Sequence, residues 1–288
     1  MKTSRLILLT ILAAALSTNS VSAQQKVKLG DNSALRYWSA FAQMQDAAIT
    51  SQQVKELGTI LDGTTPYDDL KFRDLVEKNK PALETMARGT ALANCDWGLD
   101  YGQGPDTPID YAPKAVAMAR LNVLYAFHLQ IVGDKEGSTR ALAAGLRFSR
   151  DIANGGSLFA TLLAKESLIE HLRTIAFVLH TDGLSAPQRT TLQKAVVQLG
   201  PDPLDWQSAM RLEMAALNRP PWQASVPLDR VTQAYVAALN DPSLLPKLED
   251  VIAATPQPLR DVIPNPKQVL EEKQDFADKL REIRSRLQ

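Results

Sequence analysis

The fold is decided by residues 111–181, which read YAPKAVAMARLNVLYAFHLQIVGDKEGSTRALAAGLRFSRDIANGGSLFATLLAKESLIEHLRTIAFVLHT. Two short turns, Gly133-Asp134 and Gly155-Gly156-Ser157, divide this stretch into three long segments of helical character. Glycine readily adopts the left-handed conformation that ends a helix, and an Asp or Ser side chain then caps the next one. Because turns this short place consecutive helices side by side and antiparallel, we expect the three helices to form the centre of the core.

The first of these three helices is apolar over most of its circumference. Pro113 suits its first turn, where a backbone amide would have no helical partner. One stripe along the helix and the row beside it carry Ala117, Leu121, Leu124, His128, Ile131, Val116, Val123 and Phe127. This pattern is typical of a helix that is buried on several sides.

Helix signals continue through the rest of the chain, and no run of alternating β-branched and polar residues predicts a strand. We expect further helices at 31–44, 51–62, 66–79, 81–94, 186–199, 203–218, 228–239, 243–254 and 267–287. Prolines that suit a helix start are Pro66, Pro81, Pro113, Pro203, Pro242 and Pro266. The sequence therefore predicts an all-α fold of stacked antiparallel helical hairpins, an α-α superhelix-like bundle with an amphipathic C-terminal helix.

Composition and charge exclude some classes of partner and cofactor. Of the 288 residues, 45% are hydrophobic, and Lys plus Arg and Asp plus Glu both number 32, so the formal net charge is zero. This balance gives no reason to expect a nucleic-acid partner. The sequence also contains no phosphate loop, dinucleotide fingerprint, Gly-x-Ser-x-Gly elbow or His-Glu-x-x-His motif. We therefore expect no cofactor and no metal site.

The N-terminus has the pattern of a signal peptide over residues 1–23. Two basic residues precede the apolar run 6–16, and a Val-Ser-Ala sequence ends at Ala23. We expect cleavage after Ala23 and a periplasmic or secreted protein without a membrane span. Residues 24–254 would form the helical domain, and residues 255–288 a stiff, proline-rich connection followed by the C-terminal helix.

The C-terminal helix differs from the others because its apolar stripe is narrow. The stripe consists of Val269, Phe276, Leu280, Ile283 and Leu287, and most of the remaining positions are charged or polar. A stripe of this width suits a helix that docks onto the body of its own chain, or one that forms a homodimer or binds a partner. Both interpretations stay open at the level of sequence.

The loop that precedes the long apolar helix is the strongest candidate for a site. It reads CDWGLDYGQGP from Cys95 to Pro105, and it is rich in glycine, aromatic and acidic residues. Loops of this length often carry function, although aromatic residues here could instead plug the end of the helical stack. With two residues from elsewhere in the chain, the candidate ligand-binding set is Asp96, Trp97, Asp100, Tyr101, His128 and Trp222.

Two sharper chemical interpretations of the same loop have little support from the residues around it. Asp96, Asp100, Asp106 and Asp110 could supply oxygens to Ca²⁺, but their spacing does not match an EF-hand loop. Cys95 is the only cysteine, so an intrachain disulfide is excluded. No motif accompanies Cys95 that would favour a nucleophile, and a lone cysteine commonly behaves as a small apolar residue.

Two classes of function are compatible with these residues, and a third, purely structural interpretation also stays open. Stacked helices offer long concave surfaces, which favours an exported binding or scaffolding protein with a protein or peptide partner. The alternative is a periplasmic hydrolase or lyase whose site lies at the Asp96–Tyr101 loop and uses Asp96 or Asp100 together with His128. The alternative requires these three side chains to converge in one pocket.

Several short motifs resemble those of a group of uncharacterised exported bacterial all-helical proteins. The matching residues occur in the same order in this chain and are Asn32, Tyr37-Trp38-Ser39-Ala40-Phe41, Cys95-Asp96-Trp97-Gly98 and Gly133-Asp134. The resemblance implies an exported all-helical protein. It implies no catalytic residue, because the group has no established activity.

Overall fold

The structure is a computed structural model of the chain. It describes residues 29–45, 49–101, 107–181, 184–217, 228–257 and 259–288.

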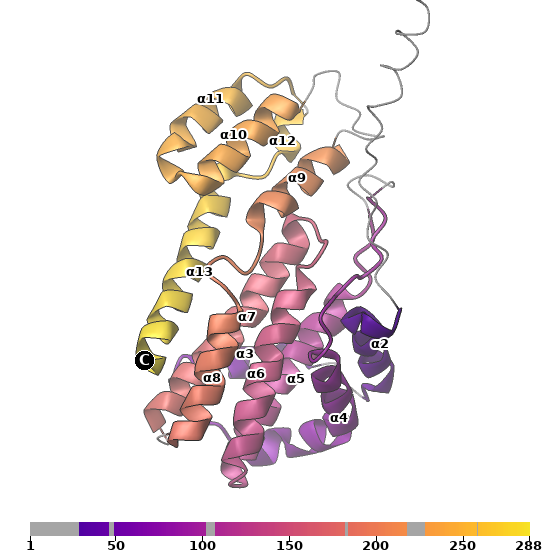
Figure 1. Ribbon diagram of the computed structural model, residues 1–288, viewed down its shortest axis with the longest axis vertical. Coiled ribbons are helices and arrows are strands. Elements are labelled where there is room, and N and C mark those ends of the chain that lie inside the picture. Colours follow the sequence, from indigo (N-terminus) through magenta and orange to yellow (C-terminus); the bar gives the residue numbers. More distant parts are fainter. Residues whose placement is uncertain (1–28, 46–48, 102–106, 182–183, 218–227, 258) are drawn as a thin grey trace, which may run out of the picture.

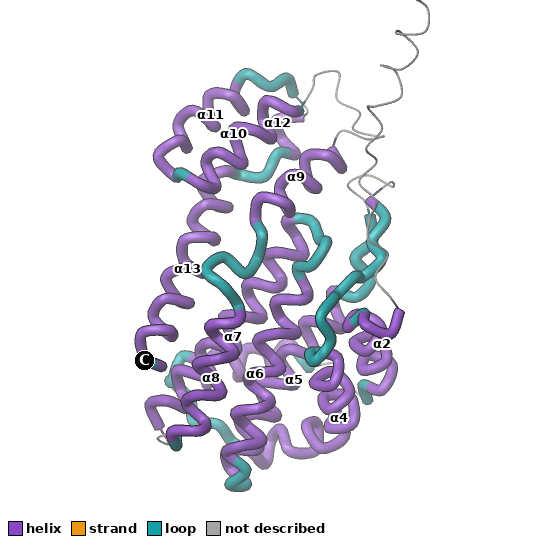
Figure 2. Tube along the Cα trace, in the orientation of Figure 1, coloured by secondary structure: helices purple, strands orange, loops and turns teal. Residues whose placement is uncertain are grey.

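Helices make up the architecture, as the sequence predicts (Figure 1). The α-helices are α2 (Ser33–Gln43), α3 (Ser51–Leu61), α4 (Asp69–Gly89), α5 (Ala112–Ile131), α6 (Lys135–Ile152), α7 (Leu158–Thr181), α8 (Ala186–Gln198), α9 (Trp206–Leu217), α10 (Asp229–Asn240), α11 (Leu245–Ala253), α12 (Leu259–Val262) and α13 (Pro266–Leu287). Short 3-10 helices occur at Leu29–Asp31 and Pro242–Leu244. Within the described residues there is no β-strand, and the all-α prediction is confirmed (Figure 2).

The helices α5, α6 and α7 form the centre of the core, as expected from the sequence. Gly133 has a φ of 86°, and the Asp134 carboxylate accepts a hydrogen bond from the Gly137 amide at 2.8 Å, so this turn joins α5 to α6 as predicted. Helix α5 packs against α2, α4, α6 and α7, which explains why it is apolar on most sides. Helix α8 continues the series by packing against α6 (Figure 1).

A buried polar cluster connects these three central helices. The Asn122 side-chain amide of α5 donates to the Ala141 carbonyl at 2.9 Å and lies 3.1 Å from His171 Nε2 of α7. His171 Nδ1 lies 2.7 Å from the Ser167 carbonyl, an acceptor, so this nitrogen carries the ring proton and Nε2 accepts from Asn122. Burial lowers the pKa of His171 to about 4. The neutral ring therefore completes the hydrogen bonds of the cluster at physiological pH.

Gly145 of α6 allows this close approach. A Cβ atom at this position would lie 2.1 Å from His171 Nε2 and 2.3 Å from Asn122 Nδ2, both within the buried cluster. Any side chain at position 145 must therefore separate α6 from α5 and α7, or displace their hydrogen bonds.

Three of the expected helix starts are wrong. Helix α4 begins at Asp69, three residues after Pro66, because the Asp68 carboxylate caps the Leu70 amide at 3.1 Å. Pro81 lies inside α4, which runs on without a break. Pro203 lies in a turn ahead of α9, whose first residue is Trp206.

The physical reason for the unbroken α4 lies just before Pro81. The Asn79 side chain is buried and donates to the carbonyls of Leu75 and Gln45, at 2.9 and 2.8 Å. It also accepts from the Gln45 amide at 2.9 Å. These bonds hold α4 against the segment after α2, and this tertiary anchor outweighs the local preference for a break at proline.

The C-terminal segment folds back along the body of the chain. Helix α13 packs against α7, α8, α10 and α11, and its apolar residues Val269, Phe276, Leu280, Ile283 and Leu287 are all buried there. The narrow apolar stripe therefore docks α13 onto the body of its own chain. A homodimer through α13 stays a prediction and would need another of its faces. The connection before α13 contains the single turn α12, so it is less extended than expected.

None of the helices in the described part of the chain is long and apolar enough to cross a bilayer.

We predict that Gly145→Ala lowers the free energy of unfolding by about 1–3 kcal/mol, because the added methyl group overpacks a rigid, hydrogen-bonded contact. Urea unfolding of the two proteins would measure this difference. Gly58→Ala in α3 is the matched control, since a Cβ there would meet no atom within 4 Å. The control is expected to stabilise the protein by up to about 1 kcal/mol through helix propensity. Equal effects of the two variants would contradict the close-approach argument.

His171 also predicts a dependence of stability on pH. Its folded pKa of about 4 lies below its usual value of 6.5, so the unfolded chain binds this proton first as the pH falls. The contribution is fully present above pH 6.5 and is lost between pH 6.5 and 4, at a cost of about 3 kcal/mol. His171→Gln should flatten the decline of the unfolding free energy across this window. An unchanged slope in the variant would show that other groups cause the decline.

Candidate functional site

The first half of the candidate loop closes the C-terminal end of α6. Trp97 Nε1 donates to the Asp151 carbonyl at 2.7 Å, and the Tyr111 hydroxyl donates to the Ile152 carbonyl at 2.8 Å. The two rings stack with centroids 3.9 Å apart. Cys95 Sγ lies 3.7 Å from the same Asp151 carbonyl. These contacts satisfy carbonyls that the end of a helix leaves without partners.

The carboxylate of Asp151 joins the same region to α2. It is buried and accepts from the Tyr37 hydroxyl at 2.8 Å and from Arg147 at 3.0 Å. Burial, with the nearby Asp151 charge, raises the pKa of Tyr37, so this hydroxyl stays protonated and keeps donating. Arg147 in turn donates to the Ala93 carbonyl at 3.0 Å. The segment around Trp97 therefore has a clear structural role.

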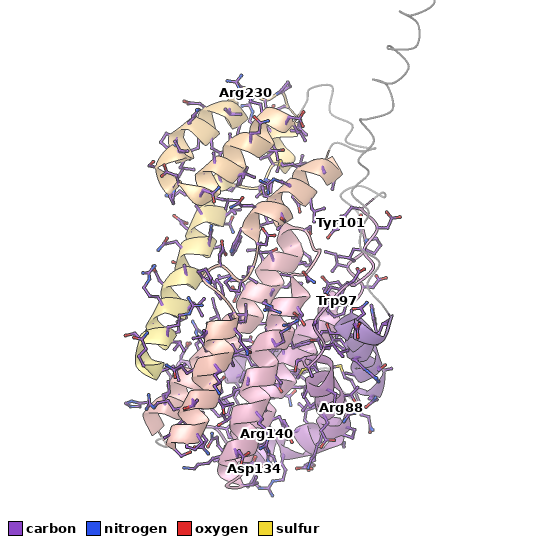
Figure 3. All side chains as sticks on the ribbon, in the orientation of Figure 1. Arg88, Trp97, Tyr101, Asp134, Arg140 and Arg230 are labelled. Atoms are coloured by element: carbon purple, nitrogen blue, oxygen red, sulfur yellow. The ribbon has the colours of Figure 1, made fainter. Side chains whose placement is uncertain are left out.

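The acidic residues of the loop face outward. The Asp96 carboxylate accepts from the Gly98 amide at 2.9 Å, and the Asp96 amide donates to the Asn32 side chain at 2.9 Å. Asp96 and Asp100 are both exposed. Figure 3 shows Trp97 beside α2 and Tyr101 farther along the loop, toward α9.

His128 lies in a different part of the molecule. It occupies the last turn of α5, about 25 Å along that helix from Tyr111, which stacks on Trp97. Its two ring nitrogens lie 2.8 Å from Asp69 and 3.0 Å from Glu77, both in α4. The structure thus does not bring His128 together with Asp96 or Asp100. Trp222 lies outside the described residues.

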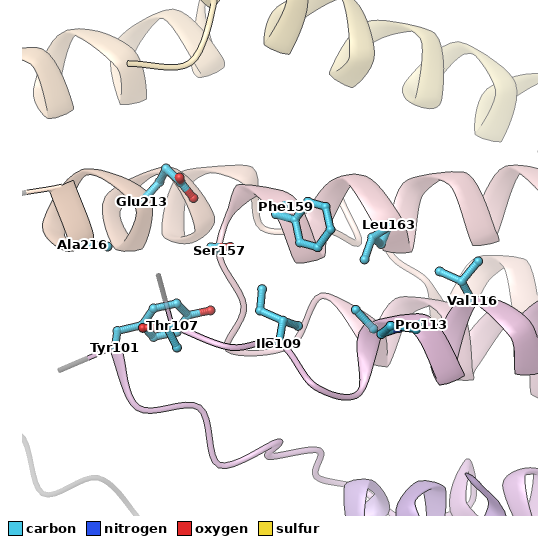
Figure 4. A pocket seen from close by; sticks show the side chains of 11 residues that line it. Tyr101, Thr107, Ile109, Pro113, Val116, Ser157, Phe159, Leu163, Glu213 and Ala216 are labelled. Atoms are coloured by element: carbon cyan, nitrogen blue, oxygen red, sulfur yellow. The ribbon is translucent and has the colours of Figure 1, made fainter. Parts of the chain in front are cut away.

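Tyr101 belongs to a cavity that Asp96, Trp97, Asp100 and His128 do not line. The cavity has a volume of about 510 Å³ and lies between the loop, the N-terminal turns of α5 and α7, and α9 (Figure 4). Its lining comprises Tyr101, Thr107, Ile109, Ala112, Pro113, Val116, Ser157, Phe159, Leu163, Glu213 and Ala216. This volume is in the range of ligand-binding pockets.

Polar groups gather at one end of this cavity. The Glu213 carboxylate of α9 accepts from the Leu158 amide, the first residue of α7, at 3.2 Å. Burial raises the pKa of Glu213, and hydrogen bonds from Leu158 and Ser157 oppose that rise. The Tyr101 hydroxyl is buried beside Ser157, and among the described residues no hydrogen bond of good geometry reaches its oxygen. This polar end of the cavity can therefore form hydrogen bonds with a ligand.

The rest of the cavity is apolar and opens to solvent. Phe159 lies at its mouth with 56% of its surface exposed. Figure 4 shows Phe159 and Leu163 of α7 in sequence away from Glu213, with Ile109 and the α5 residues Pro113 and Val116 across from them. An exposed aromatic ring next to a concave apolar lining is a common feature of binding sites.

Sequence reasoning found only Tyr101 of this site. Glu213 and Phe159 were missed because they come from two other helices, and Ser157, which precedes α7, was interpreted as a helix cap alone. One available signal was the carboxyl of Glu213 within the run LEMAAL, where an acidic residue interrupts an apolar segment.

The described residues around the cavity offer no cluster of metal ligands. Within the described residues, no three or more His, Cys, Asp and Glu side chains form a group that could hold a metal ion.

Comparison of the chain with protein-family models, curated proteins and solved structures found no match.

Cys95 gives a test of the closed part of the loop. Burial raises the pKa of its thiol to about 12, and the side chain is 7% exposed. We expect iodoacetamide at neutral pH to modify Cys95 at least about a hundredfold more slowly in the folded protein than in urea, because thiolate and access are both lacking. Mass spectrometry over time measures the rate. Fast modification of the folded protein would show that the Trp97 segment opens readily.

Proposed function

We propose that this chain is an exported helical binding protein whose cavity holds an apolar side chain of a peptide or protein partner. The observation that carries the proposal is the convergence of exposed Phe159, the apolar lining and the carboxyl of Glu213 in one open cavity. Export rests on the signal-peptide pattern of residues 1–23, which lie outside the described residues.

The polar end of the cavity favours a ligand that donates hydrogen bonds. Glu213 accepts in its ionised form, and Tyr101 and Ser157 beside it can also accept. A fatty acid or another ligand with an anionic head would meet no cationic side chain among the lining residues of the cavity, so the lining does not favour it. A peptide supplies backbone N–H donors next to an apolar side chain, and so matches both ends of the cavity.

The alternative of a hydrolase or lyase at the Asp96–Tyr101 loop has less support. Its three proposed groups do not converge, since His128 contacts Asp69 and Glu77 of α4. General acid–base chemistry requires the reacting groups to lie within hydrogen-bonding reach of one substrate.

Selecting binders to the purified protein from a displayed library of random peptides tests the proposal. Selected peptides should share an aromatic or large aliphatic residue, and their dissociation constants can be measured by fluorescence anisotropy. Phe159→Ala should raise these constants at least about tenfold, because it removes the exposed aromatic contact. Glu213→Gln should also raise them, since it removes the charge but keeps an acceptor for the Leu158 amide.

Leu70→Ala is the matched control, because Leu70 is 78% exposed on α4 and does not line the cavity. It should leave the dissociation constants unchanged. The proposal fails if the peptides bind Phe159→Ala as tightly as the parent protein. It also fails if a fluorescent fatty acid occupies the cavity and no peptide displaces it.

A further inference from the structure

A second hollow of the molecule, between α6 and α8, has a strongly basic lining. It has a volume of about 520 Å³. Four of its lining residues are cationic and none is acidic, and the complete lining is Ala87, Thr90, Arg140, Ala143, Ala144, Arg147, Arg150, Thr191, Lys194, Ala195, Gln198 and Leu199. We call this hollow the basic groove.

The helical repeat explains the shape of the basic groove. On α6 the lining positions 140, 143, 144 and 147 follow one face at spacings of three and four residues. On α8 the positions 191, 194, 195 and 198 follow the same spacing. Alanines at the middle of each face leave space between the packed helices, and long basic side chains border that space. Figure 3 shows Arg140 toward the N-terminal end of α6, near Asp134.

The positive charge of the basic groove is only partly neutralised by the protein. Arg147 and Arg150 share one carboxylate, that of Asp151, at 3.0 and 3.3 Å. Arg140 pairs with Glu136, and both of these side chains are mostly exposed. Lys194 forms no ion pair with any described residue. Four cations therefore face two carboxylates, which leaves two positive charges.

The distribution of the cations indicates the kind of anion that would fit. Arg140 and Arg147 are two helical turns apart, a rise of about 10 Å, and Arg150 extends the row by one more turn. A single small anion can contact only part of such a row. Guanidinium groups pair with phosphoryl oxygens through two parallel hydrogen bonds, and lysine adds a point charge.

We propose that the basic groove binds a ligand that carries two or more phosphoryl groups. The groove is separate from the apolar cavity and shares no lining residue with it, so this inference does not depend on the proposed peptide site. Arg140 and Lys194 supply charge from opposite helices, and Arg150 adds charge at the end nearest Asp151. Arg147 contributes its charge alone, because its guanidinium already donates to Asp151 and to the Ala93 carbonyl. Free polyphosphates and phosphorylated lipid headgroups present the same chemistry.

Isothermal titration with inorganic tripolyphosphate at low ionic strength tests the proposal. We expect saturable 1:1 binding to the full chain that weakens as salt increases, because the contacts are electrostatic. The double variant Arg140→Gln, Lys194→Gln should bind at least about tenfold more weakly. Ala144→Glu should also weaken binding, because it places a negative charge within the groove and leaves all four cations in place.

Lys55→Gln in α3 is the control for a lost positive charge, since Lys55 is exposed and does not line the groove. It should bind tripolyphosphate like the parent chain. Sedimentation with vesicles that contain cardiolipin, a lipid whose headgroup carries two phosphoryl groups, separates the two sources. Loss of vesicle binding in the double variant would assign the groove to a lipid headgroup. The proposal is overturned if tripolyphosphate and vesicles both fail to bind. It is also overturned if all variants bind alike, or if an oligo-aspartate peptide binds more tightly than tripolyphosphate.

Discussion

The rest of the structure depends on the close contact of α5, α6 and α7 at Gly145. A glycine in the middle of a helix ordinarily costs stability, because it gives up backbone entropy and contributes no side chain. Here the missing side chain leaves room for His171 and Asn122, which hydrogen-bond across the contact. The three helices are thereby fixed at one level along their axes. The positions of α2, α4, α8 and α13 follow, because each packs against a member of this trio.

A second constraint fixes the end of the trio near the candidate site. The last carbonyls of α6 are satisfied by Trp97, Tyr111 and Cys95, and the Asp151 side chain is shared between Tyr37 and Arg147. These bonds hold the start of the loop in one place, and Tyr101 farther along it lies in the cavity beside α7 and α9. The described part of the loop therefore has a structural segment around Trp97 and a residue, Tyr101, that lines a cavity.

The two hollows of the molecule arise from different features of helix packing. The apolar cavity lies where a loop and the ends of three helices meet and cannot fill the space between them. The basic groove lies along the sides of two helices whose facing residues are alanines. The first combines apolar surface with a carboxyl group, and the second combines free volume with excess positive charge. These differences in chemistry are the reason for proposing unrelated ligands.

The sequence by itself determined the class of fold and most of the helices, because apolar periodicity and Gly, Asp and Pro punctuation act over a few neighbouring residues. The Gly133-Asp134 turn, for example, joins α5 to α6 where the sequence predicts it. The exceptions depend on distant partners: Pro81 stays inside α4 because Asn79 is anchored to Gln45. Of the candidate site, the sequence identified the loop and Tyr101. Only the tertiary structure decided that His128 faces α4 and that Glu213 and Phe159 join Tyr101, because those distances depend on how whole helices pack and not on local spacing.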